Sequence, residues 1–79
     1  MNNEKIKNAT WLLQSMIDDF KYDIKNEEKE LAWTENNIMV FKEGCNVEKL
    51  REHATYLKKQ LECDNNVLER LIEIREVLK

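Results

Sequence analysis

The sequence predicts an all-α fold, an antiparallel helical hairpin of two long helices, on three observations. The 79 residues include no proline and a single glycine, Gly44. Apolar residues recur at alternating steps of three and four, which is the spacing of one helical face and not of a strand. Turn-forming residues are too few for the connections of a β-sheet. We therefore expect residues 1–79 to form a single helical domain.

The first helix is expected over about residues 4–43. Alternate steps of four and three from its first apolar residue reach eleven positions, and eight of these are apolar: Ile6, Thr10, Leu13, Ile17, Phe20, Ile24, Glu27, Leu31, Thr34, Ile38 and Phe41. Such a stripe buries against a neighbouring helix. Residues 34–37, Thr-Glu-Asn-Asn, are poor helix formers and could interrupt this helix, which would leave a short extra helix before Gly44. The sequence leaves both arrangements open.

The second helix is expected over about residues 47–78, after a turn at residues 44–46. Its stripe has ten positions, eight of them apolar: Val47, Leu50, Ala54, Leu57, Leu61, Asp64, Leu68, Leu71, Arg75 and Leu78. Gly44 readily ends a helix, and the Asn46 side chain can cap the next one. So short a connection predicts antiparallel helices, with Ile17 near Ile72. Residues 64–66, Asp-Asn-Asn, are a second candidate interruption.

Glu27 and Asp64 occupy stripe positions at similar heights on the two helices. One interpretation is a buried polar layer that fixes the register or marks a ligand site. The other is a local bend or rotation that leaves both carboxylates in water. We favour the second, because the neighbouring asparagines are poor helix formers.

Charge and composition exclude several classes of function. The net charge is −3, and the acidic surplus lies within residues 1–35. A weakly acidic chain lacks the clustered cations that bind DNA or an anionic membrane surface. No apolar run approaches a signal peptide or a membrane span, so we expect a cytoplasmic protein.

Catalytic and cofactor motifs are not found in the sequence. It has no glycine-rich phosphate loop and no serine or cysteine with an evident base. His53 is the single histidine, and Cys45 and Cys63 are too far apart to form a close-spaced ligand pair for zinc. We therefore expect a protein that is not an enzyme and that holds no cofactor or metal.

Extra apolar residues near the two termini predict self-association. A single hairpin seam buries little surface, and these residues widen both stripes at the same end, which implies a third or fourth helix. The simplest supplier is a second copy, giving a homodimeric four-helix bundle, and a partner's helix is the alternative. Trp11 is expected in the core. The predicted residues are Ala9, Trp11, Leu12, Met16, Val67, Ile74 and Val77.

A partner site is predicted around Trp33, which lies outside the apolar stripe. If the first helix is continuous, Trp33 forms an exposed patch with Met39, Val40 and Tyr56, and if the helix breaks, the patch becomes core. Acidic residues also form a ridge on the first helix, made of Asp19, Asp23, Glu27 and Glu30. The ridge is either a docking strip for a basic partner or, as we favour, a solvated helix face.

These features favour a small protein-binding regulator or inhibitor. A composition rich in lysine, asparagine and glutamate suits an accessory protein of a phage or mobile element. The alternative is an RNA-binding hairpin dimer that uses the most basic stretch, Lys42, Lys49, Arg51, Lys58 and Lys59, although Glu43, Glu48 and Glu52 are interleaved with it. A third possibility is a structural component of an assembly.

Overall fold

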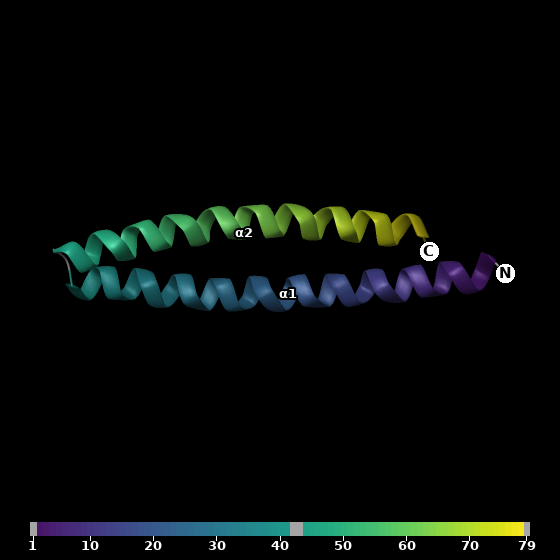
Figure 1. Ribbon diagram of the computed structural model, residues 1–79, viewed down its shortest axis with the longest axis horizontal. Coiled ribbons are helices and arrows are strands. Elements are labelled where there is room, and N and C mark those ends of the chain that lie inside the picture. The colour runs from purple at the N-terminus through teal and green to yellow at the C-terminus, as the bar shows by residue number, and fades with distance from the viewer. Residues whose placement is uncertain (1, 42–43, 79) are drawn as a thin grey trace.

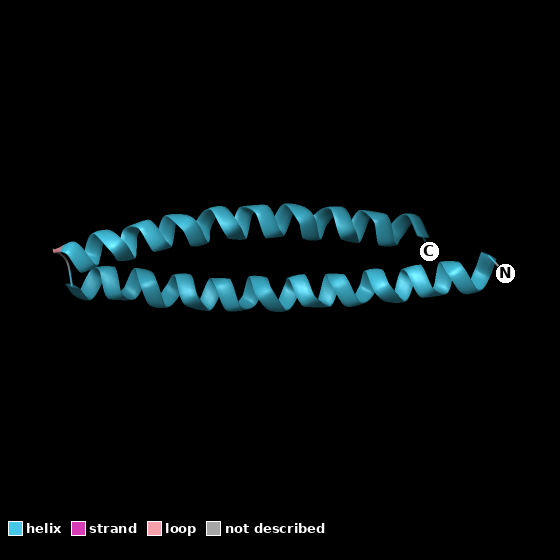
Figure 2. Cartoon of the chain, viewed as in Figure 1, coloured by secondary structure: helices cyan, strands magenta, loops and turns pink. Residues whose placement is uncertain are grey.

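The computed structural model confirms the all-α helical hairpin. It describes residues 2–41 and 44–78, and every described residue except Gly44 is helical. Helix α1 spans Asn2–Phe41 and helix α2 spans Cys45–Leu78. The two helices lie side by side and antiparallel along a rod of 62 × 14 × 14 Å (Figure 1), and the described part contains no strand (Figure 2). We call the end with both termini the open end and the other the turn end.

The two predicted stripes face each other and form the core. All of their positions are buried or half-buried except Ile6 and Phe41, the outermost positions of the α1 stripe. A cluster of packed apolar side chains lies toward the open end, where Ile17 is fully buried. Ile72 packs into the same cluster, as the antiparallel register predicts. The members of this cluster are Leu13, Ile17, Phe20, Leu68, Leu71, Ile72 and Leu78.

Neither candidate interruption breaks its helix. The hydroxyl of Thr34 donates a hydrogen bond to the Glu30 carbonyl at 2.8 Å, and the Asn37 amide donates to the Trp33 carbonyl at 2.8 Å. Asn65 bonds to the Leu61 carbonyl in the same way, at 2.8 Å. These side chains bond to the preceding turn of their own helix, so they leave its backbone ladder intact. The alternative with a short extra helix before Gly44 is therefore wrong.

The turn is tighter than the sequence indicates. Gly44 has a φ of +116°, a conformation that residues with a side chain rarely adopt. Its carbonyl accepts the first hydrogen bonds of α2, from the backbone N–H groups of Val47 at 3.1 Å and Glu48 at 3.3 Å. Gly44 is thus the cap, and Asn46 lies inside the first turn of α2 instead of preceding it. The predicted end of the first helix at residue 43 lies outside the described residues.

We predict that Ile17→Ala lowers the free energy of unfolding by about 3 kcal/mol, because the substitution opens a cavity at a fully buried position of the seam. Chemical denaturation followed by far-ultraviolet circular dichroism measures this. Tyr22→Ala is the control, since Tyr22 is 67 % exposed and its truncation should cost below about 0.5 kcal/mol. Equal losses in the two variants would contradict the packing described.

Candidate functional site

Two long surfaces flank the seam, one on each side. We call one of them the mixed face. Its residues follow one another at steps of three and four, so they project to the same side of each helix. On α1 they are Ala9, Leu12, Met16, Asp19, Asp23, Asn26, Glu30, Trp33, Asn37 and Val40. On α2 they are Asn46, Lys49, His53, Tyr56, Gln60, Cys63, Val67, Arg70, Ile74 and Val77. Grooves lined from both helices lie at each end of this face.

The open end of the mixed face is apolar. Ala9, Leu12 and Met16 of α1 line a groove with Ile74 of α2. Val67 lies seven residues before Ile74 and Val77 three residues after it, so both extend the apolar surface along α2. All of these side chains are exposed. Six of the seven residues predicted for self-association thus gather on this face.

Trp11 is the exception. Its side chain is 71 % exposed, so the expectation that it lies in the core is wrong for the single chain. Adjacent residues on a helix point about 100° apart, so Trp11 and Leu12 leave α1 on different sides of the seam. Trp11 lines a groove with Gln14 and Arg75 on the other flank, which we call the opposite face.

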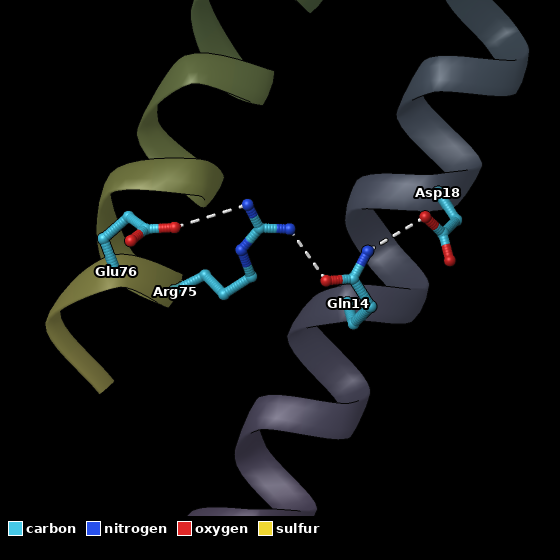
Figure 3. Close-up of polar contacts among 4 residues, drawn as sticks. All are labelled: Gln14, Asp18, Arg75 and Glu76. Carbon is cyan, nitrogen blue, oxygen red and sulfur yellow. Dashed lines mark hydrogen bonds and ion pairs between the residues drawn. The ribbon is translucent and has the colours of Figure 1, made fainter. Parts of the chain in front are cut away.

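A chain of polar contacts crosses the opposite face near the open end (Figure 3). Arg75 occupies a stripe position, and its Nη1 donates to Oε1 of Gln14 at 2.8 Å. The Gln14 amide donates in turn to Oδ1 of Asp18 at 3.0 Å, and Nη2 of Arg75 pairs with Oε1 of Glu76 at 3.4 Å. The contacts direct the guanidinium toward Gln14 and Asp18, so the mixed face stays apolar at this height.

The turn end of the mixed face carries aromatic side chains. Trp33 is 62 % exposed and borders a groove that His53 lines from α2. Nε2 of His53 lies 2.9 Å from Oε1 of Glu30, which ties the two helices together. The His53 ring also stacks on Tyr56, with 6.3 Å between ring centroids. The contacts of His53 with Glu30 and with Tyr56 were not predicted from the sequence, although steps of three and four from Trp33 and from His53 reach the same groove.

Met39 does not belong to this aromatic group. It is 73 % exposed, but it lines a groove on the opposite face together with Arg51 and Lys58. Val40, seven residues after Trp33, lies on the mixed face and is exposed. The single patch expected from Trp33, Met39, Val40 and Tyr56 is therefore divided by the seam. Steps of three and four from Trp33 reach Val40 and pass over Met39, which is the signal that separates them.

Acidic residues occupy the middle of the mixed face. Asp19, Asp23 and Glu30 are exposed and continue the line of Leu12 and Met16 along α1. These three residues of the predicted ridge thus lie between the apolar open end and the aromatic turn end, whereas Glu27, predicted in the same ridge, lies in the seam. Acidic and apolar surface share one side of the hairpin.

A pair of carboxyl groups lies in the seam beneath this ridge. Asp64 is buried, so the expectation that both carboxylates are in water is wrong. Burial, a hydrogen bond to Asp64 and the charges of Asp64, Asp23 and Glu30 together raise the pKa of Glu27 from 4.5 to about 7. Oε2 of Glu27 is buried with no hydrogen-bond partner among the described residues, while Gln60 donates to Asp64 at 3.3 Å. The polar layer is therefore part of the interior.

The basic residues of the turn-end half do not converge on one surface. Arg51 and Lys58 line the opposite face, whereas Lys49 lines the turn-end groove of the mixed face. Lys59 is one position beyond Lys58 and lies on the outer side of α2, away from the seam. Lys42 lies outside the described residues.

No family model matches the chain, and neither do any curated protein or solved structure. Within the part of the chain that the structure describes, no helix has an apolar stretch long enough to cross a membrane.

We predict that the protein becomes less stable as the pH rises from about 4.5 to about 7. Because the pKa of Glu27 is higher in the folded state than the ordinary value of 4.5, the folded protein binds more protons in this interval, and the free energy of unfolding falls as they leave. We expect a fall of about 1 kcal/mol, since solvent screens this half-buried carboxyl. Urea denaturation at a series of pH values measures it.

Glu27→Gln should remove this dependence and should exceed the native chain in stability at pH 8, by a similar amount. Glu28→Gln is the control, because it makes the same change of charge on the exposed residue next along α1. A pH dependence that survives in Glu27→Gln would contradict the assignment.

Proposed function

We propose that the chain is a protein-binding regulator or inhibitor and that the mixed face is its binding surface. The observation that carries the proposal is the exposure of large apolar side chains at both ends of one face. Trp33 and Tyr56 are exposed at the turn end, and Leu12, Met16 and Ile74 at the open end. Exposed apolar surface of this kind is typical of sites that bind other proteins.

The shape of the surface supports a helical ligand. A third helix packed into the groove beside a two-helix seam completes a bundle, and an amphipathic helix in an apolar groove is a recurring mode of recognition. Tryptophan and tyrosine are also enriched among the residues that dominate binding energies. Trp33 and Tyr56 are thus the side chains expected to contribute most at the turn end.

The RNA-binding alternative receives less support. An RNA surface requires several cations on one side of the protein, to displace counterions from neighbouring phosphates. Here Arg51 and Lys58 lie on the face away from Lys49, and His53 contacts Glu30. The acidic middle of the mixed face would repel the nucleic acid backbone.

We predict that Trp33→Glu abolishes capture of a protein partner from lysate of the source cell, because it places a charge where an apolar contact is needed. The measurement is a tagged pull-down, with and without ribonuclease, read by mass spectrometry. Tyr22→Glu is the matched control, since Tyr22 is a similarly exposed aromatic that lies on neither flank of the seam. It should capture as well as the native chain.

Capture that disappears with ribonuclease would contradict the protein-binding proposal and favour RNA. Equal loss in Trp33→Glu and Tyr22→Glu would contradict the assignment to the mixed face. Salt provides a further check, because an apolar contact resists salt whereas counterion release makes RNA binding fall steeply with it.

Self-association through the open end stays a prediction for the isolated chain. Two copies that overlap antiparallel only at their open ends would bury Leu12, Met16 and Ile74 and keep their acidic ridges apart. We expect Leu12→Glu combined with Ile74→Glu to sediment as a monomer at concentrations where the native chain sediments as a dimer. A native chain that is monomeric at high concentration would contradict this.

A further inference from the structure

We propose that the docking element of the partner is a single amphipathic helix, apolar at both ends and basic in the middle, that lies along the mixed face and packs into the grooves at its two ends. This inference rests on the proposed function and names the chemistry of the ligand. It follows from the order of apolar, acidic and aromatic side chains along the face.

The dimensions of the face set the length of such a helix. At a rise of about 1.5 Å per residue, the 17 residues from Met16 to Trp33 separate the two apolar ends by about 26 Å. The acidic stretch from Asp19 to Glu30 covers about 16 Å of this distance. A partner helix that only reaches from Met16 to Trp33 needs about 18 residues, and one that covers the mixed face from Ala9 to Val40 needs roughly 30, with its cations confined to the central dozen.

The acidic side chains in the middle of the mixed face favour a ligand that carries cations there. Asp19 and Asp23 are exposed there and form no ion pair with another described residue, and Asp64 and Glu27 lie beneath them in the seam. Among described residues on this stretch of the mixed face, Arg70 is the only cation. A lysine or arginine brought into the groove would be attracted by the exposed acids and would reduce the repulsion that they exert on Glu27.

A second copy of the chain does not place cations opposite the acidic middle of the mixed face. A two-fold pairing of mixed faces over their full length brings the two acidic ridges together, and like charges placed opposite each other oppose association. Neither helix offers a basic middle on the required side. The lysines in the centre of α1 that flank the seam, Lys21 and Lys25, continue the line of Gln14 and Asp18 on the opposite face. The occupant is therefore a different chain.

Charge also differs between the two flanks along the middle of α1. On the opposite face, Lys21 and Lys25 lie between Asp18 and Glu28, and Lys58 of α2 is followed by Glu62. On the mixed face, Asp19, Asp23 and Glu30 follow one another along α1 with no cation between them. A partner helix with a basic middle therefore meets acids alone along the mixed face of α1, and charges of both signs along the opposite face.

The test uses the full chain and two synthetic peptides of about 30 residues, each with an identical apolar stripe at both ends. One peptide has lysines at its central polar positions and the other has glutamates. Isothermal titration calorimetry measures their dissociation constants. We expect the lysine-centred peptide to bind at least tenfold more tightly in low salt, with a ratio of one peptide to one hairpin.

A charge-swapped hairpin provides the decisive comparison. Asp19→Lys with Asp23→Lys should reverse the preference, so that the glutamate-centred peptide binds at least tenfold more tightly than the lysine-centred one. Glu28→Lys with Glu62→Lys is the control, because it makes the same change of net charge at exposed positions away from the mixed face. Circular dichroism confirms that each variant is folded before it is titrated.

The outcomes separate this inference from the proposed function. Equal binding of both peptides, lost in Trp33→Glu, would overturn the basic-helix inference and leave an apolar docking face. Binding of neither peptide would also overturn it, and the pull-down would then decide the proposed function independently. Reversal of preference in the control variant would show that overall charge, and not the acidic ridge, determines the choice.

Discussion

Burial of the two apolar stripes against each other is the constraint on which the remaining structure depends. A seam made from every third or fourth residue fixes the rotation of both helices about their axes, and Gly44 fixes their antiparallel register through a conformation suited to glycine. Once rotation and register are set, every other side chain is assigned to one flank or to the outer surface. The mixed face exists because Leu12, Asp23 and Trp33 are all assigned to the same flank.

A hairpin with one seam leaves both flanks uncovered, and polar residues distinguish them. On the opposite face, Gln14 and Arg75 form a hydrogen-bonded chain across the seam near the open end. On the mixed face, the helices are bridged toward the turn end by His53 and Glu30 instead. The apolar open end of the mixed face therefore has no polar contact across it among the described residues. Its Leu12 and Ile74 can be buried by a partner without breaking a hydrogen bond within the hairpin.

Periodicity was sufficient to predict both helices and their pairing, because the spacing of residues such as Ile17 and Leu71 reports helical geometry directly. The continuity of α1 through residues 34–37 could not be predicted, since threonine and asparagine side chains bond either to their own helix or to a competing turn. The burial of Asp64 was missed for a related reason. A stripe position indicates that a residue lies on the side of its helix that faces the seam. Whether a carboxyl at that position is buried depends on the side chains that it contacts across the seam.

The division of the predicted patch has a simpler origin. Proximity in sequence grouped Met39 with Trp33 and Val40, and Trp11 with Leu12, whereas helical rotation separates them. Part of the candidate site could therefore have been found from the sequence by applying the same three and four steps to exposed residues as to the core. The stacking of His53 on Tyr56 and the contact with Glu30 required the register of the two helices in three dimensions.

The two tryptophans lie on different flanks, so their fluorescence tests most directly whether the mixed face is the docking surface. Trp11→Phe leaves Trp33 as the reporter, and Trp33→Phe leaves Trp11. With saturating lysine-centred peptide, we expect emission from Trp33 to shift to the blue and to become protected from acrylamide quenching, while emission from Trp11 is unchanged. Protection of Trp11 with no change at Trp33 would place the ligand on the opposite face and contradict docking on the mixed face.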